Sequence, residues 1–239
     1  MKTPNLYLSA LWMAGAIFAF SATAVAGREA THALSDSALS ISQLVFFRNV
    51  IGLAVVTALV LMFTSAQQRR LTASAFKLHL GRNTSHFMGQ WCWFYGLSIL
   101  PLAQVFAIEF TVPIWTAFFA SMLLAETITW RRTVAIIMGF AGVLLILRPG
   151  FVEVPNAAWV VLMGAVAYAL SHTLTKKLSG QGSALLVIFY MHVMQLPLAL
   201  VFVSFGFAWP EGINWLYVAI TALAAMTAHF CMTKALSNL

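Results

Sequence analysis

Long apolar segments recur along this 239-residue sequence, and no other feature constrains its fold as strongly. A helix needs about 20 apolar residues to cross the hydrocarbon core of a membrane. Eight segments reach or approach that length, over residues 6–26, 43–63, 79–98, 102–124, 133–147, 157–174, 184–207 and 215–236. Charged residues make up only 8% of the chain, against roughly a quarter in soluble proteins. We therefore predict an all-α, polytopic helical membrane protein.

Several other classes of protein are excluded by composition and motifs. Both cysteines, Cys92 and Cys231, lie within apolar segments, which argues against a disulfide-stapled scaffold. The net charge of +7 would suggest nucleic-acid binding in a soluble protein, but the basic residues form no continuous stripe and no known binding motif. The chain has no His-Glu-x-x-His zinc motif, no Gly-x-Ser-x-Gly nucleophile turn and no phosphate-binding loop. We predict no nucleic-acid partner, no metal and no cofactor.

The positions of the thirteen lysines and arginines predict the orientation of the chain. A cytoplasmic N-terminus places ten of them on the cytoplasmic side: Lys2, Arg69, Arg70, Lys77, Arg82, Arg131, Arg132, Lys176, Lys177 and Lys234. Only Arg28 and Arg148 fall on the other side, and Arg48 lies within a span. Because cytoplasmic loops carry an excess of Lys and Arg, we predict a cytoplasmic N-terminus, in the inner (plasma) membrane of a bacterium.

The first apolar segment has a second interpretation. Ala24-Val25-Ala26 before Gly27 is typical of a signal-peptide cleavage site. The apolar run is longer than a usual signal peptide, however, and a related segment recurs near Gly164. We therefore favour a retained helix.

Short sequence words recur in the same order along the chain and indicate an internal repeat. Three pairs lie roughly 140 to 150 residues apart: Gly15-Ala16-Ile17 with Gly164-Ala165-Val166, Leu44-Val45-Phe46-Phe47 with Leu186-Val187-Ile188-Phe189, and His86-Phe87 with His229-Phe230. The offset corresponds to five spans, an odd number, so the second copy would insert upside down. Inverted repeats of this kind are common in secondary transporters, whose substrate site lies between the copies.

The stretch from Tyr95 to Gly150 resembles the EamA type of the drug/metabolite transporter superfamily. The words that carry the resemblance are Tyr95-Gly96-Leu97, Pro101, Pro113, Leu123-Leu124-Ala125-Glu126, Gly139-Phe140-Ala141-Gly142-Val143 and Pro149-Gly150. The resemblance implies two inverted repeats of five helices around a central cavity that moves small metabolites. The first repeat would be residues 1–150, and the second, residues 151–239, contains only three of its five helices. We expect the chain to be part of a longer transporter, or to need a partner that supplies two helices.

Two ionisable residues within the spans are candidates for the substrate pathway. Arg48 and Glu109 lie at similar predicted depths, roughly 8 and 10 Å below the outer ends of their helices at 1.5 Å per residue. A charge inside a membrane costs about 2.5–3.5 kcal/mol by the lower estimates, so each needs a partner or water. They could form a structural bridge, share a pathway, or lie separately at the interface. Glu126, by contrast, follows its span beside Arg131 and Arg132, where a structural pairing is expected.

The third span carries polar and aromatic residues at helical spacing. His86, Gln90 and Trp93 share one face at steps of three to four residues, and Trp91 and Tyr95 lie on an adjoining strip. Such a face could line a cavity for an amphipathic or aromatic solute, or it could pack against neighbouring helices and lipid. Tyr168 and His172, one turn apart on the sixth span, have the same two interpretations.

Two prolines predict kinks. Pro113 has no N–H to bond the carbonyl of Glu109, and Pro197 similarly leaves the carbonyl of Val193 without its helical donor. Lipid cannot satisfy such a carbonyl, so a kinked segment should face protein or water.

These observations favour a transporter of small organic metabolites, working by alternating access in a lipid bilayer, over an enzyme. A non-transporting membrane subunit is the alternative, and an intramembrane hydrolase using Ser98 or Ser171 is a weaker one. A homodimer is compatible with the sequence.

Overall fold

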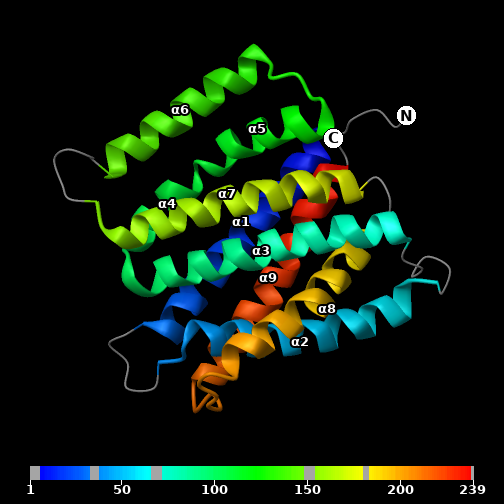
Figure 1. The fold of residues 1–239 in the computed structure, drawn as a ribbon, viewed down its shortest axis with the longest axis vertical. Helices are drawn as coiled ribbons and strands as arrows, with labels where there is room; N and C mark the ends of the chain where they lie inside the picture. Colours follow the sequence, from blue (N-terminus) through cyan, green and yellow to red (C-terminus); the bar gives the residue numbers. More distant parts are fainter. Residues whose placement is uncertain (1–5, 33–37, 66–71, 148–153, 180–182, 238–239) are drawn as a thin grey trace. The chain divides into compact units, whose positions relative to one another are not determined.

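The computed structural model describes residues 6–32, 38–65, 72–147, 154–179 and 183–237 (Figure 1). All regular secondary structure in these residues is helical, which confirms the predicted fold class. The helices are α1 (Leu6–Thr31), α2 (Ile41–Phe63), α3 (Ala73–Ile99), α4 (Leu102–Glu109), α5 (Val112–Leu124), α6 (Trp130–Leu147), α7 (Asn156–Ser179), α8 (Ala184–Val203) and α9 (Asn214–Ser237). Each of the eight predicted segments contains a helix, and α3 begins six residues earlier than expected.

Six described segments are long and apolar enough to cross a membrane: Leu6–Thr31, Ile41–Phe63, Leu102–Leu124, Asn156–Leu178, Ala184–Val203 and Asn214–Ala235. α3 is outside this set, and it carries Lys77, Arg82 and Asn83 among its apolar residues. α6 is also outside it and has only 18 residues. The chain is therefore an integral, multi-pass membrane protein with one conspicuously polar helix.

The helices form two compact units. Unit 1 comprises residues 1–83 and 174–239, and unit 2 comprises residues 84–173. The boundaries fall within α3 and α7, so each of these helices contributes one part to each unit. These units are defined by packing and not by internal similarity, so the repeat boundary near residue 150 stays a prediction.

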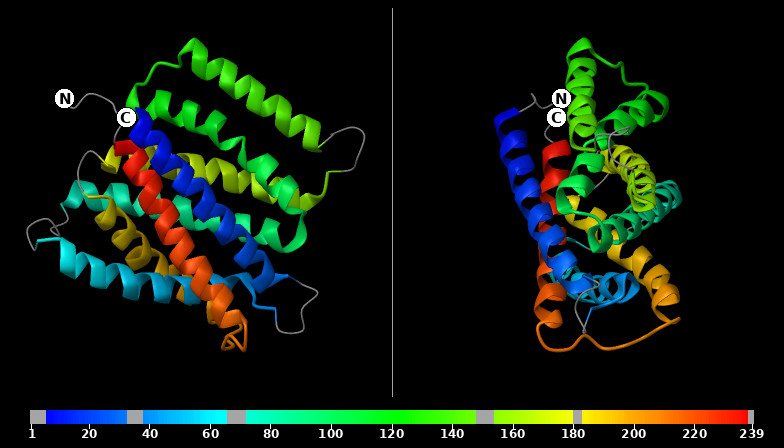
Figure 2. Two further views of the ribbon diagram at one scale, coloured as in Figure 1. Left: turned by 180° about the vertical axis from the view of Figure 1, so that it is seen from behind. Right: turned by 90° about the vertical axis from the view of Figure 1, so that its left-hand side faces the viewer.

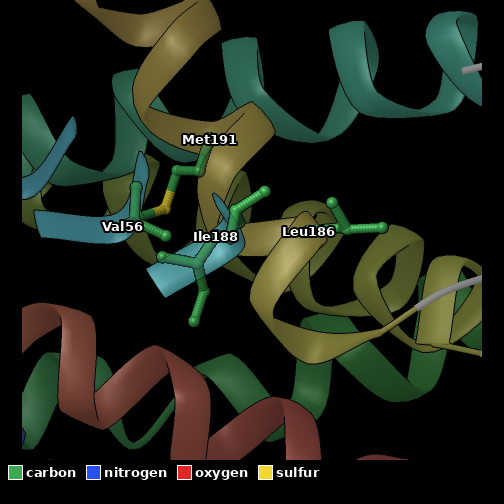
Figure 3. Close-up of a cluster of buried hydrophobic side chains, with 5 residues drawn as sticks. Val56, Leu186, Ile188 and Met191 are labelled. Carbon is green, nitrogen blue, oxygen red and sulfur yellow. The ribbon is translucent and has the colours of Figure 1, made fainter. Parts of the chain in front are cut away.

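In unit 1, α1 and α9 lie side by side (Figure 2). Trp12 meets Phe230 edge to face at 5.9 Å between ring centroids, and Phe20 meets His229 at 5.1 Å. The second pair in this unit is α2 and α8, which enclose a cluster of buried apolar side chains, Val56, Val60, Leu186, Ile188 and Met191. Figure 3 shows Ile188 and Met191 of α8 pointing towards Val56 of α2.

The start of α2 is set by a capping box. The Ser40 hydroxyl accepts from the Gln43 N–H at 3.2 Å, and the Gln43 side-chain oxygen accepts from the Ser40 N–H at 2.8 Å. These bonds satisfy amides that the first helical turn leaves without partners. They start α2 two residues before the predicted span.

In unit 2, glycines bring α3 and α7 close together. A Cβ atom added at Gly164 would lie 2.7 Å from Cys92 Cβ and 3.2 Å from the Gly89 carbonyl oxygen. At Gly96 an added Cβ would overlap Val161. Small residues at such contacts let membrane helices approach closely enough for van der Waals packing to hold them together.

The predicted span over residues 102–124 is not one continuous helix. α4 ends at Glu109 and α5 begins at Val112, and the Thr111 N–H donates to the Ile108 carbonyl at 2.9 Å between them. Pro113 lies in the first turn of α5, where its missing N–H has no helical partner to lose. Pro197, in contrast, lies inside the uninterrupted helix α8.

Candidate functional site

A stripe of buried polar and aromatic side chains runs along α3 in unit 2. It consists of His86, Gln90 and Trp93, which we call the α3 stripe, and each is buried. Positions four and then three residues apart lie on the same face of a helix, about 5–6 Å between Cβ atoms. The spacing in the sequence therefore places these three side chains in one row.

Helix α7 covers the His86 end of the α3 stripe. The rings of His86 and Tyr168 meet edge to face at 5.3 Å between centroids, and Tyr168 stacks on His172 at 5.9 Å. Gly89 makes this possible, because a Cβ atom there would lie 2.9 Å from the Tyr168 ring. The structure thus brings together His86, Tyr168 and His172, three of the residues singled out from the sequence.

Helix α4 supplies the carboxylate at the other end of the α3 stripe. Glu109, the last residue of α4, accepts a hydrogen bond from the indole Nε1–H of Trp93 at 3.0 Å. A charged group at membrane depth needs such a donor, because hydrocarbon offers none. The Glu109 side chain and the Trp93 indole therefore lie together, and Trp93 is one helical turn from Gln90.

Gln90 occupies the middle of the α3 stripe. Its side chain is 0% exposed, and neither its amide oxygen nor its amide nitrogen has a hydrogen-bond partner among the described residues. Leaving a buried amide unsatisfied costs about 1–3 kcal/mol, so nearly all such groups have partners in folded proteins. A primary amide offers both a donor and an acceptor, which a bound polar solute could use at once.

The adjoining strip of α3 adds a pair of aromatic side chains. Trp91 and Tyr95 lie with their rings nearly parallel, 6.0 Å apart with an interplanar angle of 6°. The indole nitrogen of Trp91 is buried and has no hydrogen-bond partner in the described part of the chain. Trp91 directly follows Gln90 in sequence, and Tyr95 lies about one turn beyond Trp91, so the pair occupies a neighbouring direction on the helix.

Arg48 belongs to unit 1, whereas Glu109 belongs to unit 2. The Arg48 side chain is buried in α2. Glu109 accepts a hydrogen bond from Trp93. The pairing of Arg48 with Glu109 stays a prediction. The predicted structural pairing of Glu126 is observed, with Arg132 Nη1 at 3.5 Å.

Unit 1 contains buried polar contacts around α8 that the sequence did not single out. The amide nitrogen of Asn49 donates to the Val45 carbonyl at 2.8 Å, so its oxygen faces His192 Nδ1 at 2.9 Å and accepts from it. The His192 ring packs directly over Gly52, where a Cβ atom would overlap it. The sequence feature that could have indicated this contact is Asn49, a single amide inside the apolar run of α2.

A second group of buried polar contacts joins α3 to α7 and α8 within unit 1. Arg82 donates to Asn83 Oδ1 at 2.7 Å and to Thr175 Oγ1 at 3.1 Å. The Asn83 amide donates to the Tyr190 carbonyl at 3.1 Å, and Gln195 donates to the Asn83 carbonyl at 3.1 Å. These bonds fix the positions of the polar side chains. Such an arrangement is compatible with a structural role and with contact to a solute.

The described residues contain no group of three or more His, Cys, Asp or Glu side chains that could hold a metal ion. Within unit 2, the arrangement around the α3 stripe offers a carboxylate, an amide, imidazoles and aromatic faces. Such a set can bind a planar polar molecule by hydrogen bonds and stacking.

The chain is similar to known membrane transporters. The sequence profile of the EamA-like transporter family matches residues 7–148. The S-adenosylmethionine uptake transporter of Rickettsia felis is 25% identical over 160 residues, which are 67% of this chain and 54% of that protein. The riboflavin transporter of Vibrio cholerae is 27% identical over 229 residues, 95% of this chain and 75% of that protein. The chain thus spans about half the length of the first relative.

A crystal structure with 18% sequence identity covers 98% of this chain, and this chain covers 81% of it, with a TM-score of 0.74. At this identity the likeness concerns the fold alone. It agrees with the all-helical architecture described above.

Proposed function

We propose that this chain, which belongs to the EamA-like transporter family, takes part in moving small organic solutes across a membrane by alternating access. The α3 stripe would line the solute pathway. The observation that carries the proposal is Gln90, a completely buried amide whose two polar atoms have no partner in the described structure. A packed helix contact would select an apolar residue at such a position, since an unsatisfied amide is costly.

The solute class we propose is a planar heteroaromatic ring with a hydrogen-bond donor next to an acceptor. A Gln amide can bond both groups at once, as it does with the N6 and N7 edge of adenine in DNA recognition. Trp93 and the Trp91–Tyr95 pair offer aromatic faces for stacking. Two relatives are named for S-adenosylmethionine and riboflavin, whose adenine and isoalloxazine rings both carry such an edge.

A binding measurement tests this role for Gln90. Gln90→Leu keeps the size of the side chain and removes both polar atoms. Two hydrogen bonds contribute about 1–3 kcal/mol together, so we expect affinity for riboflavin or S-adenosylmethionine to fall roughly 5- to 150-fold in equilibrium dialysis of the purified 239-residue chain. Ser121→Ala is the matched control, because this exposed hydroxyl donates only to the Phe118 carbonyl of its own helix.

A ligand analogue tests the same hydrogen bonds by changing the solute instead of Gln90. Riboflavin methylated at the ring N–H between its two carbonyls keeps the aromatic area and loses the donor. We expect the wild-type chain to bind this analogue more weakly than riboflavin, and Gln90→Leu to bind the two equally. Equal binding of both ligands by the wild-type chain would remove Gln90 from recognition.

Arg48 and Glu109 are proposed to contribute charges to the same pathway. Both lie within apolar segments, where an ionisable group is costly and is kept for structure or function. Exchanging the two charges separates these roles. If the residues only pair, Arg48→Glu combined with Glu109→Arg should fold and bind solute, whereas a specific need for the carboxylate beside Trp93 should leave a folded chain that does not bind.

The orientation we propose has a cytoplasmic N-terminus and two repeats of opposite direction. It is supported by the excess of basic residues on one predicted side, including Lys176 and Lys177 in the last turn of α7. Cysteines replacing Ser74 and Asn156, in a background without Cys92 and Cys231, should react oppositely with an impermeant thiol reagent on intact cells. Labelling of the cysteine at Asn156 alone fits the proposal, and labelling at Ser74 alone reverses it.

A further inference from the structure

An apolar groove lies on unit 1 between α2, α8 and α9. It has a volume of about 390 Å³, within the range of small-molecule sites. Its lining includes Phe63 from the last turn of α2, Leu185 and Ile188 from the first turns of α8, and Met226 and Phe230 from α9. The groove therefore lies where α2 ends and α8 begins, beside the second half of α9.

The bottom of the groove belongs to the hydrophobic core of unit 1. Ile188 is part of the buried cluster with Val56 and Met191 (Figure 3). Leu185, Met226 and Phe230 pack against this cluster. The packed cluster gives the groove a firm base. The Phe63 side chain, in contrast, is 71% exposed and would meet hydrocarbon at the rim.

The lining suits a hydrocarbon chain and not a polar solute. Its one polar residue is Thr227, whose hydroxyl donates to the Leu223 carbonyl within α9 at 2.8 Å. That bond uses the hydroxyl proton, so Thr227 offers a ligand no donor. The solute proposed for the α3 stripe would find no hydrogen-bond donor in this lining, and the groove belongs to the other unit.

The ammonium group of Lys234 lies next to the groove. The Lys234 ammonium lies 5.7 Å from the centroid of the Phe230 ring, and Phe230 lines the groove. Lys234 is in the last turn of α9, where a lysine at the end of a span reaches the membrane surface. An occupant with a hydrocarbon chain and an anionic head would match both the groove and this charge.

We propose that unit 1 binds an anionic phospholipid, with one acyl chain in the groove and its phosphate head beside Lys234. A zwitterionic lipid shares the acyl chain but adds its own cation next to the lysine. One lysine near a membrane surface contributes about 1 kcal/mol to binding an anionic lipid, which corresponds to roughly a fivefold preference.

Native mass spectrometry of the delipidated 239-residue chain in detergent tests this site. We expect dioleoyl phosphatidylglycerol to bind at one site with roughly fivefold higher affinity than dioleoyl phosphatidylcholine. Lys234→Gln should abolish the preference but retain binding of both lipids. Met226→Trp should fill the groove and lower the binding of both, whereas Leu223→Trp, which adds the same bulk at an exposed position of α9 outside the lining, should not.

A crosslinking measurement keeps the test decisive if a variant does not fold. Phosphatidylglycerol with a photoreactive acyl chain should label wild-type peptides containing Ile188 and Met226 more than the peptide containing the exposed Leu145. Equal affinity for the two lipids, unchanged binding by Met226→Trp, or uniform labelling would each overturn the proposal. Uniform labelling would mean that only annular lipid surrounds the chain. Because the site lies outside the α3 stripe, its failure leaves the proposed function of Gln90 untouched.

Discussion

The hydrogen bond from Trp93 to Glu109 fixes one end of the α3 stripe, and its strength can be measured. The donor–acceptor distance of 3.0 Å is in the usual range for N–H···O bonds, and the acceptor is a carboxylate. Bonds to charged groups contribute about 1.5–3 kcal/mol in soluble proteins, whereas interhelical bonds in a membrane protein average about 0.6 and reach about 1.7. We therefore predict a coupling energy of about 1–1.5 kcal/mol between the two side chains.

A double-mutant cycle isolates that coupling. Trp93→Phe removes the donor, Glu109→Leu removes the acceptor, and the double variant removes both, so the packing losses cancel. The free energy of unfolding would be measured by reversible SDS titration in mixed micelles. Glu109→Gln keeps an acceptor oxygen and should lose less stability than Glu109→Leu. A coupling within about 0.3 kcal/mol of zero, equal to that of a control cycle pairing Trp93→Phe with Ser121→Ala, would show that the bond does not hold the site together.

Two further predictions concern packing in each unit. Gly164→Val should destabilise unit 2 by about 1–3 kcal/mol in the same titration, because its Cβ would press on Cys92, whereas Gly142→Ala, with no atom within 4 Å, should be neutral or slightly stabilising. Asn49→Leu should cost about 1–3 kcal/mol by leaving buried His192 without its acceptor, and adding His192→Leu should recover part of the loss. Equal stability of the two glycine variants, or a neutral Asn49→Leu, would contradict the packing described here.

The helices could be predicted because membrane thickness sets their length. Apolar runs near 20 residues indicated eight spans, and each contains a helix in the structure. The sequence predicted a kink at the Glu109 carbonyl, but it did not predict that the helix would end there and a new helix begin after Phe110 and Thr111. A proline shows that a helical bond is missing, but packing decides whether the helix bends or stops.

The candidate site was only partly predictable. Helical spacing was enough to put His86, Gln90 and Trp93 in one row, because three residues of one helix keep fixed relative positions. Spacing along one helix could not predict that Tyr168, a separate candidate on α7, packs against His86. For Glu109 the charge argument considered only Arg48, an opposite charge, whereas the observed donor is the neutral indole of Trp93.

The most direct test of the account is solute flux through the protein itself. Liposomes containing this chain within a longer transporter, or together with a partner that supplies the two further helices, should give saturable uptake of labelled riboflavin or S-adenosylmethionine. Gln90→Leu should lower uptake at sub-saturating solute by roughly the 5- to 150-fold loss expected for binding, and Ser121→Ala should not. Wild-type flux by the folded Gln90→Leu transporter, or no flux above protein-free liposomes from the folded wild-type transporter with all its helices, would contradict the account.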